Sequence, residues 1–215
     1  PVFPEPHEQD HNAPPVNPLP VSVVLLALAI FGVEIVMTAA DANLIGGPAA
    51  TGWRLAAIEV YGFYQPLMAW MMETHVLRWD YLARFVTYPF VHGTFTHALF
   101  VLVFLLAMGK LVGEVLADWA VLVIFFGATI IGALVYGLVF ETRVMLYGGY
   151  PGAYGLVGAF TFILWAGLAG NARGLQAFTL IAFLMGIQLV FGLFVDQGPT
   201  WVAELVGFAT GFGLA

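Results

Sequence analysis

The segment Gly148–Phe160 reads GGYPGAYGLVGAF, and it is the stretch that says most about the fold of this chain. Glycines and other small residues open an apolar run in which Tyr150 and Tyr154 are the polar side chains. Proline is tolerated in the first turn of a helix, so Pro151 predicts that a helix begins here. Small residues at helical spacing allow two membrane helices to pack backbone against backbone. The stretch therefore predicts a membrane helix packed closely against another helix.

The composition of the whole chain predicts a membrane protein. Of its 215 residues, 61% are hydrophobic and 9% are charged, whereas soluble domains have roughly 45–50% apolar and about 25% charged residues. The formal net charge is −7, so the chain lacks the basic field that would hold a nucleic-acid backbone. It has no cysteine, which excludes disulfides and thiolate chemistry. We expect an integral multi-pass protein, located in a bacterial cytoplasmic (inner) membrane because no targeting feature is evident.

Six apolar runs predict an all-α bundle of six transmembrane helices. The first run, Val21–Thr38, has about the length that a bilayer core requires, roughly 20 helical residues. The other five runs are Phe95–Val115, Trp119–Phe140, Pro151–Ala169, Leu175–Val195 and Trp201–Ala215. We expect one membrane domain over residues 21–215, with a last helix that is cut short and native termini that lie outside this sequence.

Two segments differ from the apolar runs in composition. Residues 1–20 hold seven of the twelve prolines together with several acids, which predicts a disordered acidic tail in which His7 and His11 are solvated rather than bound to a metal. Residues 40–83 form a long first loop rich in Trp and Tyr, which predicts interfacial helices lying along the membrane. Glu34, inside the first apolar run, is costly unless it faces the protein interior or the membrane interface.

The spacing of glycines predicts which spans pack together. Two sets of glycines lie at helical spacing, Gly152, Gly155 and Gly158 on the fourth span and Gly207 and Gly211 on the sixth. Small residues at this spacing let helices approach closely, although a chain with 25 glycines also produces such spacings by chance. Glu204 lies one helical turn before Gly207 and would turn its charge toward the same interface. We predict that the fourth and sixth spans contact each other.

Three segments resemble rhomboid intramembrane proteases. Arg84–Glu114, RFVTYPFVHGTFTHALFVLVFLLAMGKLVGE, is similar to the second-helix region of that family, which has an arginine, two histidines five residues apart, an asparagine four residues later and a Gly…Glu ending. Gly148–Ala159 aligns with the family's Gly-Ala-Ser-Gly stretch, and Ala203–Gly211, AELVGFATG, with its Ala-His-x-x-Gly-x-x-x-Gly last helix. The resemblance implies the rhomboid fold, with the first loop on the extracytoplasmic side of the membrane.

The resemblance also implies where a catalytic site would lie. In the family, a serine on the fourth span and a histidine base on the sixth form a dyad, and a histidine and an asparagine on the second span stabilise the oxyanion. In this chain four of these positions are replaced: the serine by Tyr150, the glycine after it by Pro151, the base by Glu204 and the asparagine by Val101. The two histidines remain, as His92 and His97. Tyr154 holds the family's aromatic position beside the base.

These replacements lead us to interpret the chain as a catalytically inactive pseudo-rhomboid. A phenol has an unperturbed pKa of about 10 and is a weak nucleophile without a strong activating field. We expect no catalytic residues and no cofactor. We expect instead that the protein binds transmembrane helices of other membrane proteins or assembles into a larger membrane complex, without peptide-bond cleavage. We expect the partner to dock at the fifth span, Leu175–Val195, and at the loop Asp196–Trp201.

Several alternatives stay open at this point. The first is an active intramembrane serine-type endopeptidase of the rhomboid family in which Tyr150 and Glu204 form an unusual dyad. The same two residues could instead form a structural hydrogen bond between helices. His92, His97 and Glu204 would be a plausible triad for zinc or iron if they converged. An intramembrane Glu–His pair could also relay protons in a transporter.

Overall fold

The computed structural model describes residues 18–168, 174–192 and 198–215. These residues form helices joined by loops. The described α-helices are α1 Val21–Asp41, α2 Trp53–Tyr61, α3 Gln65–Thr74, α4 Trp79–Thr87, α5 Phe95–Val115, α6 Asp118–Val139, α7 Tyr150–Gly167, α8 Thr179–Gly192 and α9 Trp201–Leu214. Short 3₁₀ turns occur at Gly47–Gly52, Tyr88–Phe90, Gly174–Phe178 and Gly198–Thr200. The all-α prediction is confirmed for the described residues, whereas the tail predicted at residues 1–20 lies outside them except for its last three residues.

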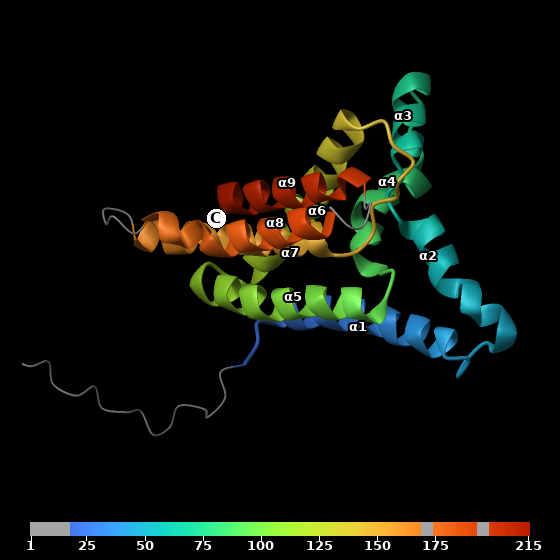
Figure 1. The fold of residues 1–215 in the computed structure, drawn as a ribbon, viewed down its shortest axis with the longest axis horizontal. Coiled ribbons are helices and arrows are strands. Elements are labelled where there is room, and N and C mark those ends of the chain that lie inside the picture. Colours follow the sequence, from blue (N-terminus) through green and yellow to red (C-terminus); the bar gives the residue numbers. More distant parts are fainter. Residues whose placement is uncertain (1–17, 169–173, 193–197) are drawn as a thin grey trace, which may run out of the picture.

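The long helices form a bundle, and the helices of the first loop gather at one end of it. In Figure 1, α1, α5, α7 and α9 run side by side along the long axis, while α2, α3 and α4 lie at the end where α1 finishes and α5 begins. The connection from α6 to α7 lies at this same end, where Phe63 and Leu146 exchange backbone hydrogen bonds of 2.9 Å. This arrangement places the first residues of α5 and α7 next to each other.

Three described helices, α1, α5 and α6, are long and apolar enough to cross a membrane. Helix α7 has 18 residues, and α8 and α9 have 14 each, so the count of six spans stays a prediction. The predicted limits of α5 are confirmed, and those of α6 and of the start of α7 differ from the structure by a single residue.

Two predicted helix limits need a larger correction. Helix α1 does not end at Thr38 but continues to Asp41, because its last turn is held by polar contacts described below. The run Leu175–Val195 is not one helix: residues Gly174–Phe178 form a 3₁₀ turn, and the α-helix begins only at Thr179. Short 3₁₀ segments are common at the ends of α-helices. Val195, the predicted end of this run, lies outside the described residues.

The first loop is helical as predicted. Helices α2, α3 and α4 occupy most of it, and large apolar side chains such as Trp79 and Leu77 point outward, with 85% and 77% of their surface exposed. Exposed tryptophans of this kind are typical of the headgroup level of a bilayer. The position of these helices along the membrane remains a prediction.

Helices α7 and α9 contact each other through their glycines, which confirms the predicted pairing of these two segments. A Cβ atom added to Gly211 would overlap the carbonyl oxygen of Gly155, and one added to Gly158 would overlap that of Phe208. Gly207 lies in the same way against the carbonyl of Pro151. Backbone contact of this kind is possible because the glycine on one helix has no Cβ atom to keep it away from the carbonyl of the other.

Gly152 lies against α6, and the atoms nearest to a Cβ atom added there all belong to that helix and not to α9. An added Cβ atom would lie 2.6 Å from the ring of Phe125, which is on α6. Gly152 therefore makes room for α6. Gly155 lies against both neighbours, because a Cβ atom there would overlap Ala128 on α6 and lie close to Gly207 on α9, while Gly158 lies against α9. Since α7 packs on both α6 and α9, its first turn is fixed from two sides.

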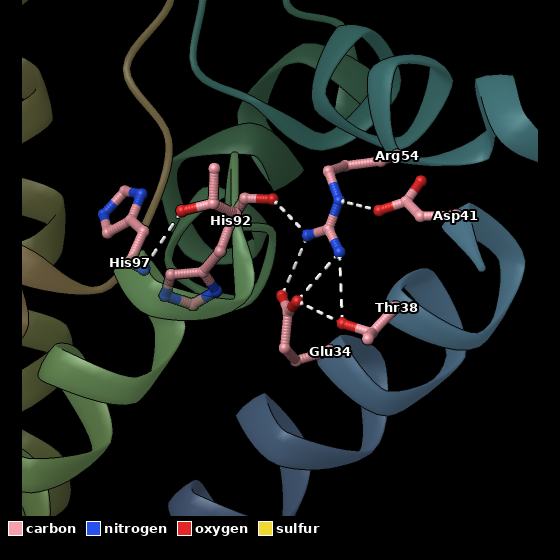
Figure 2. A network of polar contacts seen from close by, with 7 residues as sticks. Glu34, Thr38, Asp41, Arg54, His92 and His97 are labelled. Carbon is pink, nitrogen blue, oxygen red and sulfur yellow. Dashed lines mark hydrogen bonds and ion pairs between the residues drawn. The ribbon is translucent and has the colours of Figure 1, made fainter.

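A buried ion pair attaches the first loop to the bundle (Figure 2). The side chain of Glu34 on α1 is 1% exposed, and Arg54 on α2 donates from Nη2 to its Oε1 (2.8 Å) and from Nη1 to its Oε2 (3.0 Å). Arg54 also donates from Nε to Asp41 Oδ2 (2.7 Å). Of the two positions expected for Glu34, the protein interior and the membrane interface, the structure shows the first, and the partner of Glu34 is a cation that sequence reasoning did not assign to it.

Candidate functional site

The backbone before α7 is fixed by hydrogen bonds to the segment before α5. The N–H of Gly148 donates to the carbonyl of Tyr88 (2.9 Å), and the N–H of Gly149 donates to Nε2 of His92 (3.3 Å). Gly148 has a φ of +91°, and a Cβ atom there would lie 2.5 Å from the ring of His97. Both the left-handed backbone and the close approach of the imidazole require glycine at this position. The turn therefore fixes Tyr150, the first residue of α7, beside His97.

The two histidines lie together at the start of α5. Thr94 caps this helix by accepting a hydrogen bond from the N–H of His97 (3.1 Å), and the rings of His92 and His97 meet edge to face with centroids 5.0 Å apart. His92 is 2% exposed. Burial, together with the neighbouring His97, lowers the pKa of His92 to about 3. The ring is therefore neutral at physiological pH, with Nε2 as the hydrogen-bond acceptor.

His92 also connects this pair to the ion pair of the first loop. Its backbone carbonyl accepts a hydrogen bond of 2.9 Å from Nη1 of Arg54, the residue that binds Glu34. Figure 2 shows Arg54 between the carboxylates on one side and the His92 backbone on the other. The position of the histidine pair thus depends on a contact between α1 and α2.

Tyr150 covers one face of His97. The two rings are stacked, with centroids 4.9 Å apart and an interplanar angle of 21°. The ring of Tyr154, one turn further along α7, meets Tyr150 edge to face at 6.3 Å. Tyr150 is half-buried, whereas Tyr154 is 4% exposed and belongs to the core. The aromatic side chain at position 150 consequently fills the space directly above the imidazole.

A cavity of about 550 Å³ opens in front of Tyr150. Its polar lining comes from three helices, the loop before α7 and the turn before α9, and consists of His97, Tyr147, Tyr150, Thr200 and Glu204. Glu204 is 7% exposed. The apolar part of the lining comes from Pro151 and from residues 144–146 of the loop before α7. Tyr150 and Glu204 thus face one common space.

The structure separates the predicted site residues into two groups. His97, Tyr150, Pro151 and Glu204 line the cavity. His92, Val101 and Tyr154 are buried behind it, and Val101 is 0% exposed. A Cβ atom on Gly149 would lie 2.7 Å from Val101 Cγ1, so the valine packs directly under the turn that begins α7. The position for which the resemblance implies a polar amide is therefore an apolar packing position in this chain.

The histidines and Glu204 do not form a metal site in the described part of the chain. Within residues 18–168, 174–192 and 198–215, no three His, Asp or Glu side chains lie close enough together to hold an ion. His92 is turned toward Gly149 and lies outside the lining of the cavity that His97 and Glu204 share. The triad of His92, His97 and Glu204 is therefore not assembled.

The fold and the site define a helical membrane protein with a partly polar cavity at the start of a glycine-packed helix. A family model described as the rhomboid domain matches residues 80–215, which is more than half of the chain. No curated protein matches the sequence. This chain belongs to the rhomboid family, whose members are normally intramembrane serine proteases.

Proposed function

We propose that this rhomboid-family protein binds transmembrane segments of other membrane proteins and does not cleave them. The observation that carries the proposal is the stacking of Tyr150 on His97 at the position where the family resemblance implies a serine. A scissile carbonyl would have to approach this position and the oxyanion donors beside it at about 3 Å. The phenol ring occupies that approach and covers the imidazole face.

The other replaced positions support the same proposal. Val101, where the resemblance implies an amide donor, has no hydrogen-bonding group and is packed under Gly149. Glu204, which is 7% exposed, stands where the resemblance implies a histidine base, and a carboxylate is intrinsically a weaker base than an imidazole. Removal of a single catalytic group from a hydrolase site leaves little activity. Because three catalytic groups are replaced, we infer that the retained scaffold acts by binding transmembrane segments.

A client helix would dock beside α8. This helix is short, and its described side chains include Phe183, which is 63% exposed. Of the helices, α7 is the one it contacts most in the described residues. The exposed apolar face of α8 offers a surface to an incoming transmembrane segment. This position beside α8 is part of the docking position expected above, the fifth span and the loop after it. Residues 193–197 of that stretch lie outside the described residues.

Site-specific photo-crosslinking tests the proposed binding. A photoreactive amino acid is placed at Phe183 and, in a control variant, at Leu28 on α1, which is 60% exposed. Each variant is reconstituted with a model single-pass substrate of rhomboid proteases. The proposal predicts crosslinks to the intact substrate from position 183 and few from position 28. Equal yields from both positions would contradict it.

One observation favours a second function, an intramembrane endopeptidase with an unusual dyad. Tyr150 and Glu204 line the same cavity, in which a carboxylate could accept a proton from a phenol. An activity-based phosphonate probe distinguishes the two functions. Covalent labelling that disappears in Tyr150→Phe supports the endopeptidase, whereas an unlabelled protein supports binding without cleavage.

A further inference from the structure

A second cavity lies between the first loop and the connection from α6 to α7, and it is lined by two arginines. Its volume is about 350 Å³, and its lining consists of Glu59, Tyr64, Leu67, Arg84, Arg143 and Met145. The chain has only 6 lysines and arginines against 13 acids. Two of these six cationic side chains therefore line one small cavity, and this clustering needs a physical explanation.

Arg84 is held in place by backbone carbonyls rather than by a carboxylate. Its Nη1 donates to the carbonyl oxygens of Glu59 (2.8 Å) and Gly62 (2.9 Å) at the end of α2. Its Nε is buried and has no hydrogen-bond partner among the described residues. Neutral carbonyls fix the guanidinium group without forming an ion pair with it. Arg84 thus keeps its charge available to a ligand.

Arg143 supplies the second positive charge. It is exposed in the loop after α6, and within the described part of the chain it makes no ion pair. The carboxylate of Glu59 offsets one of the two positive charges at most, so the lining keeps a net positive charge. The phenol of Tyr64 adds a hydroxyl that can donate a hydrogen bond. Two guanidinium groups with a hydroxyl match the oxygens of a phosphate group, to which arginine binds in a bidentate manner.

The position of the cavity indicates where such a phosphate would come from. The cavity lies among α2, α3 and α4, at the end of the bundle shown in Figure 1. The exposed rings of Trp70 and Trp79 belong to the same helices. Tryptophans on a membrane protein mark the level of the lipid headgroups. The predicted interfacial position of the first loop would therefore place this basic cavity beside the phosphates of the adjacent leaflet.

We propose that the cavity between Arg84 and Arg143 binds a phosphate group, supplied by the headgroup of an anionic phospholipid. This site is separate from the cavity in front of Tyr150, and it goes beyond the proposed binding of transmembrane segments. Arg84 holds the phosphate from the protein side, and Arg143 closes over it from the loop. Bound lipid would then connect the first loop to the loop that leads into α7.

Native mass spectrometry of the full chain in detergent tests the proposal. The protein is titrated with phosphatidylglycerol and with phosphatidylcholine, and the bound fractions are compared. The variant is Arg143→Gln, and the matched control is Arg78→Gln, which removes the same charge from an exposed arginine paired with Asp80. We expect affinity for phosphatidylglycerol to fall about fivefold in R143Q, in line with the loss of one charge-assisted contact, and to stay unchanged in R78Q. Glu59→Gln should increase it.

Three results would overturn the proposal. Equal affinity for the two lipids would show that no anionic headgroup is selected, and an equal loss in R143Q and R78Q would show that only overall charge matters. Inorganic phosphate and glycerol phosphate, added at matched ionic strength, form the third arm. If they displace the lipid at similar concentrations, the site takes a free phosphate and the lipid source is wrong. Arg143→Lys, which keeps the charge, should retain part of the binding.

Discussion

The ring of Tyr150 lies flat against the imidazole of His97, with their centroids 4.9 Å apart. These residues come from different helices, α7 and α5, and they meet because Gly148 allows the chain to pass directly beside His97. The phenol ring therefore does two things at once. It closes one face of the histidine, and it forms the wall of the cavity that Glu204 lines from α9.

Truncation of this ring should expose His97. In Tyr150→Ala, we expect the rate at which diethylpyrocarbonate modifies His97 to rise several-fold, because the stacked face becomes open to solvent in the cavity. Peptide mass spectrometry measures the rate, with the exposed His75 as an internal standard. Tyr150→Phe keeps the stack and should leave the rate as it is. An unchanged rate in Y150A would mean that another group covers the histidine.

The glycine contact between α7 and α9 should be sensitive to a single methyl group. Gly211→Ala places a Cβ atom onto the carbonyl oxygen of Gly155, whereas a Cβ atom on Gly213 of the same helix meets no atom within 4 Å. We expect G211A to lower the free energy of unfolding by about 1–3 kcal/mol, the usual cost of overpacking. G213A should change it little. Denaturant unfolding in detergent measures both, and equal effects would contradict the packing.

The buried pair of Arg54 and Glu34 should matter far more than an exposed one. Arg54→Gln leaves the carboxylate of Glu34, which is 1% exposed, without its cation, and such a loss typically costs about 3–5 kcal/mol. The matched change Arg78→Gln breaks an exposed pair with Asp80, and solvent screening makes such surface pairs contribute little to stability. Thermal unfolding in detergent should therefore separate the two variants widely. Similar melting temperatures would show that the first loop is attached by other contacts.

Stability should decline as the pH falls, in part because of His92. Its pKa in the folded protein is about 3, while an unfolded histidine has a pKa of about 6.5. Between these values the unfolded chain binds a proton that the folded chain does not, so lowering the pH favours unfolding by at most about 1.4 kcal/mol per pH unit. His92→Gln should flatten the dependence between pH 6.5 and 4. The control His75→Gln, at an exposed position, should not.

The sequence predicts the helices well because their signals are local. Runs of apolar residues define α5 and α6 almost to the residue, and Pro151 together with its glycines marks the start of α7. The pairing of α7 with α9 is also predictable, since both segments carry small residues at helical spacing, which let membrane helices approach closely.

The contacts of the site depend on residues far apart in the chain and are harder to predict. Glu34 in an apolar run signals that a cation must lie nearby, but nothing local shows that this cation is Arg54 rather than Arg78 or Arg84. The stacking of Tyr150 on His97 depends on the backbone path at Gly148, which no periodic pattern encodes. The same holds for Gly152, whose neighbour Phe125 comes from α6 and not from α9.

The cleavage of a model transmembrane substrate in membranes tests the central claim most directly. The natural protein is compared with a variant that carries Tyr150→Ser, Pro151→Gly, Glu204→His and Val101→Asn together. Our account predicts no cleavage by the natural protein and measurable cleavage by the variant, because the scaffold around the cavity is kept and only the reacting groups are missing. Cleavage by the natural protein that stops in Tyr150→Phe would contradict it and would identify Tyr150 as a nucleophile.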